Sequence, residues 1–78
     1  MAKTYTIEFD VNEEGQQSVW AKATENSKDF EKIFHNVFKN VAITNEGCYA
    51  ESENRKDLAN KVRTFVNQLS AKGWKQIN

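Results

Sequence analysis

Residues 4–11, Thr-Tyr-Thr-Ile-Glu-Phe-Asp-Val, alternate polar and apolar side chains along their whole length. Because successive side chains of a β-strand point to opposite faces, this period of two predicts a strand with one apolar face. Residues 18–24, Ser-Val-Trp-Ala-Lys-Ala-Thr, alternate in the same way and predict a second strand. The stretch between them, Asn-Glu-Glu-Gly-Gln at 12–16, fits a three-residue hairpin loop with Gly15 in the left-handed conformation. We therefore expect the chain to open with a β-hairpin.

The loop length sets the register of this hairpin. It brings apolar residues of the two strands opposite each other, namely Phe9 with Val19, Ile7 with Ala21 and Tyr5 with Ala23. On the other face it places Glu8 opposite Trp20 and Thr6 opposite Lys22. Trp20 is then the one apolar side chain of the hairpin that falls on the polar face.

Two amphipathic helices are expected further along the chain, because apolar residues recur there at helical spacing. Ser27 is a suitable N-cap for the first helix, and Ser52 or Asn54 for the second. Gly73 lies where a helix commonly ends, and Trp74 lies where a side chain often packs back onto the last turn. The apolar stripe of the first helix comprises Phe30, Ile33, Phe34, Val37, Phe38 and Val41, and that of the second Leu58, Ala59, Val62, Phe65, Val66 and Leu69.

The segment between the helices allows two interpretations. The first helix either ends near Asn40, which leaves an extended 41–44 and a turn at 45–47, or continues to about Ile43. In both cases we expect a strand near 48–51 that joins the hairpin.

Together these elements predict a single α+β domain over residues 1–78. It is a two-layer fold in which an antiparallel sheet, made of the N-terminal hairpin and one or two short strands, packs with the two helices. The element order is ββαβα(β), where the last β denotes residues 75–78 as either a short final strand or a frayed tail.

Composition points to a binding protein of the cytoplasm with no cofactor or metal. The chain has one cysteine, Cys48, and one histidine, His35, so neither a disulfide within the chain nor a cluster of metal-binding spacing is present. A free thiol suits a reducing compartment, and neither a membrane-spanning run nor a secretory leader is evident. The net charge is zero, which argues against general affinity for nucleic acid or membrane.

Catalysis is not expected. Nucleophilic chemistry would need Cys48 paired with His35, but His35 falls on the polar side of its helix and Cys48 is expected to be a small buried residue. The adjacent carboxylates Glu13 and Glu14 belong to a hairpin loop, where a solvated acid is the simpler interpretation.

The size, composition and hairpin-then-helix start of the chain resemble those of small inhibitor proteins encoded by phages and mobile elements. These include anti-CRISPR proteins and host-takeover proteins that inhibit a host polymerase. The resemblance implies a non-enzymatic viral protein that binds a protein partner and inhibits or modulates it.

Trp20 is the main candidate for a partner contact, since exposed tryptophans are enriched at interface hot spots. Alternatively, the second helix or Trp74 covers it and makes it part of a second small core. The predicted partner-binding residues are Trp20, Lys22 and Glu8 on the hairpin, with Lys56 and Arg63 on the second helix. Phe34 and Phe38, at one edge of the first helix's stripe, are candidates for a homodimer contact.

An alternative function uses the basic second helix. Residues 1–53 contain five Lys against ten Asp and Glu, whereas residues 54–78 contain six Lys and Arg against one Asp. The cations of the second half could make this chain a small nucleic-acid-binding regulator. On the helix, however, they are divided between the two edges of the apolar stripe, as expected for long side chains beside a core contact.

Overall fold

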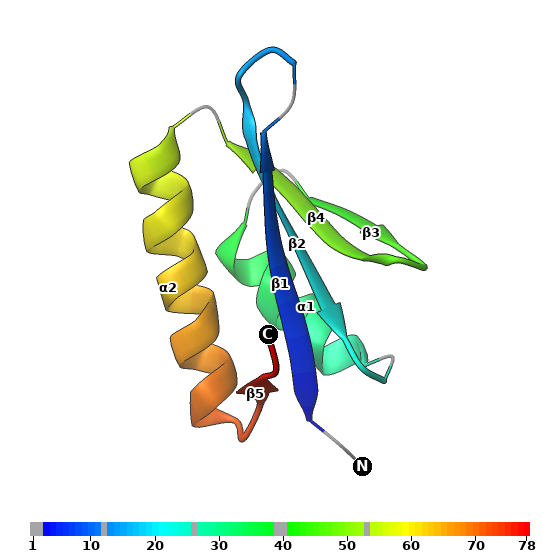
Figure 1. The fold of residues 1–78 in the computed structure, drawn as a ribbon. Coiled ribbons are helices and arrows are strands. Elements are labelled where there is room, and N and C mark those ends of the chain that lie inside the picture. The colour runs from blue at the N-terminus through cyan, green and yellow to red at the C-terminus, as the bar shows by residue number, and fades with distance from the viewer. Residues whose placement is uncertain (1–2, 12, 26, 39–40, 53) are drawn as a thin grey trace.

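The computed structural model describes residues 3–11, 13–25, 27–38, 41–52 and 54–78. Over these residues the chain forms one five-stranded sheet with two helices, and the predicted α+β class is confirmed (Figure 1). The elements are β1 (Thr4–Val11), β2 (Gln17–Ala23), α1 (Lys28–Val37), β3 (Val41–Thr44), β4 (Gly47–Ser52), α2 (Arg55–Ala71) and β5 (Lys75–Gln76).

The predicted hairpin and its register are confirmed. β1 and β2 pair antiparallel with Phe9 opposite Val19 and Glu8 opposite Trp20. Gly15 has a φ of 81°, in the left-handed region that a side chain disfavours. The loop therefore fixes which side chains of the hairpin face the core.

The sheet has the order β3-β4-β2-β1-β5, which places the N-terminal hairpin at its centre. α1 ends at Val37 and residues 41–44 form β3, so the first interpretation of this segment is confirmed. β4 pairs antiparallel with β2 and β3, as expected of a strand that joins the hairpin.

The prediction of an antiparallel sheet is wrong for the last strand, because β5 pairs parallel with β1. α2 runs opposite to β1, and the chain then reverses at Gly73, where φ is 88° (Figure 1). After this reversal β5 has the direction of β1. Two backbone hydrogen bonds hold it there, from Lys75 to Lys3 at 2.8 Å and from Ile77 to Tyr5 at 2.9 Å.

Side chains cap both helices at their N-termini. The Ser27 hydroxyl accepts from the Phe30 backbone N–H at 3.4 Å, as predicted. Of the two candidates for α2, Asn54 is the cap, since its side chain accepts from the Asp57 N–H at 3.1 Å. These caps satisfy backbone donors that the first helical turn leaves free.

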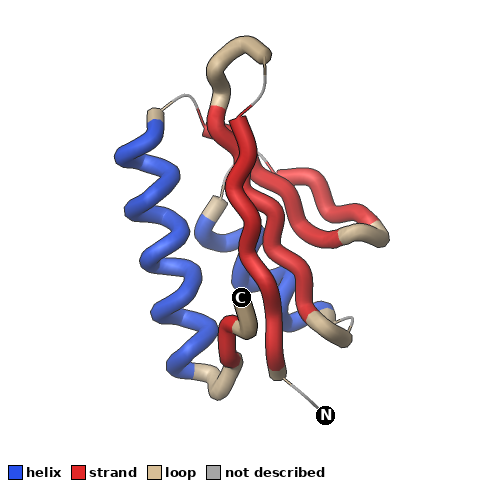
Figure 2. The backbone as a smooth tube through the Cα atoms, viewed as in Figure 1, coloured by secondary structure: helices blue, strands red, loops and turns tan. Residues whose placement is uncertain are grey.

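Both helices pack on one face of the sheet, and α1 passes behind β1 and β2 in the view of Figure 2. Phe65 of α2 lies at the centre of the core, with its ring centroid 5.2 Å from that of Phe34 and 5.5 Å from that of Phe30. Trp74, which follows α2, packs on Phe30 with a distance of 5.2 Å between the ring centroids. None of the helices in the described segments combines the length and hydrophobicity needed to cross a membrane.

The prediction that Phe34 and Phe38 form a homodimer contact is wrong, because both side chains are buried in the core. Their exposed fractions are 0% and 3%, and their rings pack against each other at 4.5 Å. The sheet and α2 cover this edge of the apolar stripe. Neither side chain is therefore available to a second copy of the chain.

Candidate protein-binding surface

Trp20 lies on the face of the sheet that carries no helix. This helix-free face is opposite the core, because Val19 and Ala21, the neighbours of Trp20 on β2, are both buried beneath the helices. Trp74 is in the core and α2 packs on the other face, so the interpretation that either of them covers Trp20 is wrong. Trp20 is nevertheless partly buried, since its ring contacts Tyr49 of β4 at a centroid distance of 4.7 Å.

The partner strand holds Tyr49 in place. β2 and β4 pair with Trp20 directly opposite Tyr49, and the Tyr49 hydroxyl donates a hydrogen bond to the Glu51 carboxylate. This hydrogen bond, together with burial and the negative charges of Glu51 and Asp10, raises the pKa of Tyr49 above its usual range. The tyrosine stays protonated and the Trp20–Tyr49 pair forms an aromatic platform of fixed geometry.

A shallow depression of about 290 Å³ lies beside Trp20. Its lining joins the three predicted hairpin residues, Trp20, Lys22 and Glu8, with two others, Thr6 and Glu46. Glu46 could not be predicted from the sequence, because it belongs to the turn between β3 and β4 and reaches this site only through strand pairing. The depression therefore combines an aromatic wall with charges of both signs.

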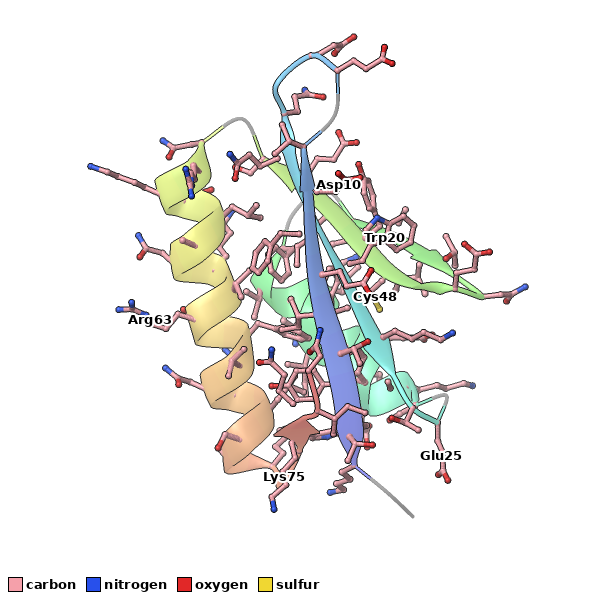
Figure 3. The ribbon with its side chains drawn as sticks, viewed as in Figure 1. Asp10, Trp20, Glu25, Cys48, Arg63 and Lys75 are labelled. Carbon is pink, nitrogen blue, oxygen red and sulfur yellow. The ribbon has the colours of Figure 1, made fainter. Side chains whose placement is uncertain are left out.

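Lys56 and Arg63 do not join this surface. Both are exposed on α2, which packs on the opposite face of the sheet. Figure 3 shows Arg63 pointing away from the sheet, on the far side of α2 from Trp20. A further cation of this helix, Lys61, forms an ion pair with Asp57 at 3.2 Å. The five residues predicted to bind a partner thus divide into two separate groups.

Cys48 has the properties of a core residue. Its side chain is 3% exposed on β4, and burial, with a smaller contribution from the charge of Glu31, raises the pKa of the thiol to about 11. At neutral pH such a thiol is protonated and a poor nucleophile. His35 is exposed on α1. Among the described residues no three His, Cys, Asp or Glu side chains come together as a metal site.

A second surface, not predicted from the sequence, lies between the second half of β1 and the first turns of α2. Phe9 and Val11 are on the core side of β1 but are 63% and 59% exposed. Together with Leu58, Ala59 and Val62 of α2, and with the polar residues Asp10, Gln17 and Arg55, they line an open groove of about 770 Å³. The alternation of residues 4–11 assigned Phe9 to the apolar face correctly, but alternation carries no information about how far a helix covers that face.

No family model matches this chain, and no curated protein or solved structure matches it either. A fold alone does not determine a function, so the function has to be inferred from the surfaces themselves.

Proposed function

We propose that this protein acts by binding a protein partner through the helix-free face of its sheet, and that it inhibits or modulates that partner without chemistry of its own. The observation that carries the proposal is the position of Trp20, an aromatic side chain that is only partly buried on a face that neither α1 nor α2 covers. In an antiparallel sheet such a face is ordinarily polar. A tryptophan there is best explained by a contact with another molecule.

The surroundings of Trp20 suit a protein interface. Interface hot spots are large aromatic side chains that lose little conformational freedom on binding, and contact with Tyr49 already restricts the Trp20 ring. Lys22, Glu8 and Glu46 lie around the depression beside it. Charged groups at the rim of an interface favour the correct orientation of a partner and disfavour other partners.

The class of partner follows from the sequence resemblance. Small phage-encoded inhibitors, among them anti-CRISPR and host-takeover proteins, act as compact α+β domains that occupy a functional surface of a host protein. The chain has their size, their composition and their hairpin-then-helix start, which supports an inhibitor. The buried free thiol of Cys48 suits the reducing cytoplasm, which is where we place this activity.

The experiment is a binding measurement on matched variants. The partner is captured from host cytoplasm with the wild-type protein, purified, and titrated with Trp20→Ala and with Arg63→Ala as the control on the opposite surface. We expect Trp20→Ala to weaken binding by at least about 30-fold, as a hot spot of about 2 kcal/mol would. We expect Arg63→Ala to change binding less than about threefold, and both variants to melt as the wild type does.

The result that contradicts the proposal is a partner whose binding depends on Lys56 and Arg63 and is insensitive to Trp20→Ala. Titration with random duplex and single-stranded DNA then tests the alternative, a nucleic-acid-binding regulator. Binding that weakens steeply with salt and is lost in Lys56→Ala would favour that alternative, because each phosphate contact releases counterions. No binding at low salt would remove it.

A further inference from the structure

The outer edge of β1 changes character at Ile7. Up to this residue the C-terminal segment covers the edge: β5 pairs with Thr4 and Tyr5, and Asn78 follows. The Asn78 side-chain amide donates to the Ile7 carbonyl at 2.7 Å and accepts from the Ile7 N–H at 3.1 Å. It pairs with both backbone groups of Ile7, as one more residue of a neighbouring strand would.

Beyond Ile7 the backbone of β1 has an open edge. The hydrogen bond from Thr24 to the Thr4 carbonyl fixes the ladder, so even-numbered residues of β1 pair with β2 and odd-numbered residues point outward. The N–H and C=O of Phe9 therefore face away from the sheet, and in the described chain no strand continues beside them. At Val11 the Asp10 carboxylate accepts from the N–H at 2.8 Å. An edge of this kind is a template for an added strand.

The groove adjoins this open edge. Its apolar lining consists of Phe9 and Val11 on β1 and of Leu58, Ala59 and Val62 on α2. Three polar residues, Asp10, Gln17 and Arg55, complete the lining. Side chains of a strand added beside β1 would alternate between the two faces of the sheet. Those on the helix side would meet the groove, which favours apolar residues at every second position.

On the helix-free face, the negative charges of β1 determine which side chains of an added strand would bind well. Glu8 and Asp10 are exposed on the helix-free face, next to the open edge, and neither is in an ion pair with a described residue. A second copy of the chain would fit poorly here. Antiparallel pairing centred on Phe9 would set Glu8 of one copy opposite Asp10 of the other, and a register shift of two would oppose the two Asp10 side chains. Like charges directly opposite each other destabilise a sheet.

We propose that the β1 edge from Glu8 to Val11 binds an extended segment of a partner protein by strand addition, with apolar side chains in the groove and basic side chains beside Glu8 and Asp10. This binding edge is distinct from the Trp20 platform, so it adds a second surface to the one in the proposed function. Glu8 borders both surfaces.

The test is an NMR titration of isotope-labelled protein with a blocked peptide of four Lys-Val repeats, compared with its Glu-Val counterpart. We expect the Lys-Val peptide to shift the backbone amides of Phe9 and Val11 and to bind at least about tenfold more tightly than the Glu-Val peptide. Equal binding of the two peptides, or shifts confined to other parts of the protein, would overturn the proposal.

Matched variants separate the groove from the edge. Ala59→Lys places a long side chain in the groove, whereas Asn60→Lys adds the same charge at an exposed neighbouring position that does not line it. We expect Ala59→Lys to lower the affinity for the Lys-Val peptide at least about tenfold, and Asn60→Lys to lower it less than about threefold. Phe9→Pro removes the outward N–H and should weaken binding at least about fivefold more than Phe9→Ala, which keeps it. Equal effects within either pair would contradict strand addition at this place.

Two further outcomes are decisive. Trp20→Ala should leave the Lys-Val affinity within about threefold, so failure of the peptide test and failure of the Trp20 test are distinguishable. Sedimentation of the wild-type protein alone should show a monomer. A dimer that Ala59→Lys dissociates would assign the edge to a second copy of the chain and overturn the proposal.

Discussion

The two halves of β1 follow one sequence pattern and have different surroundings. In the first half, Thr4–Ile7, the apolar side chains are buried under the helices and the C-terminal segment covers the outer edge. In the second half, Glu8–Val11, the apolar side chains are exposed beside a groove and the edge is open. The first half belongs to the core, and the second half is available to a partner.

The difference shows what an alternating pattern determines. It assigns each side chain to a face, and that assignment is correct along the whole of β1. Whether the face is covered depends on elements far away in the sequence. α2 and the residues after Gly73 decide it here, and among the described residues the coverage of the outer edge reaches Ile7 through the Asn78 side chain.

The largest expected difference between the halves is in stability. Tyr5→Ala removes a ring that is 1% exposed and contacts Phe30 and Phe65, so we expect a loss of about 3–5 kcal/mol in the free energy of unfolding. Phe9→Ala, on the same face of the same strand, should cost less than about 1 kcal/mol because the ring is already largely in water. Urea denaturation of both variants measures this. Equal losses would mean that Phe9 is covered in solution.

Alkaline pH tests the core that covers the first half of β1, through Cys48 of β4, which lies in that core opposite Ala21. Because its pKa is raised from 9.0 to about 11, the unfolded chain releases this proton at lower pH than the folded chain does. The contribution of the protonated thiol to the free energy of unfolding is therefore fully present below pH 9 and is lost as the pH rises toward 11. The expected loss is about 2–3 kcal/mol.

Cys48→Ala is the control for this titration, since lysines and tyrosines also titrate in the same range. The stability of the variant should decline less steeply than that of the wild type between pH 9 and 11. Parallel curves for the two proteins would show that the thiol is accessible to water in the folded state.

Asn78→Ala moves the boundary between the halves by removing both hydrogen bonds to Ile7. We expect a loss of about 1–3 kcal/mol in the free energy of unfolding, since each of the two hydrogen bonds contributes about 0.5–1.5 kcal/mol. The open edge should lengthen by one residue, and the Lys-Val peptide should then bind at least as tightly as it binds to the wild type. Weaker binding would show that Asn78 is part of the binding site.

Most of the fold could be predicted from local patterns. The hairpin register and the Ser27 cap each depend on residues near one another in sequence, and the structure confirms them. The two apolar stripes are confirmed in part, because Val41 lies in β3 rather than on the first helix and Ala59 is exposed. The parallel direction of β5 could not be predicted in this way. It results from how α2 crosses the sheet and from the turn at Gly73, and nothing in the sequence of β5 itself indicates a direction.

The candidate surface was predicted only in part. The alternation placed Trp20, Lys22 and Glu8 on one face, and the structure brings them together. Lys56 and Arg63 were grouped with them although the helix wheel gives no information on which face of the sheet α2 covers. The groove beside Phe9 could not be predicted, because the apolar pattern of a helix does not indicate which part of a strand the helix covers.

The most direct test of the change at Ile7 is amide hydrogen exchange of the free protein, followed by NMR. The Ile7 N–H is bonded to Asn78, whereas the Phe9 N–H points outward from an open edge. We predict that the Phe9 amide exchanges at least about tenfold faster than the Ile7 amide, while that of Glu8, which faces β2, is protected. A Phe9 amide as protected as that of Glu8 would contradict the open edge.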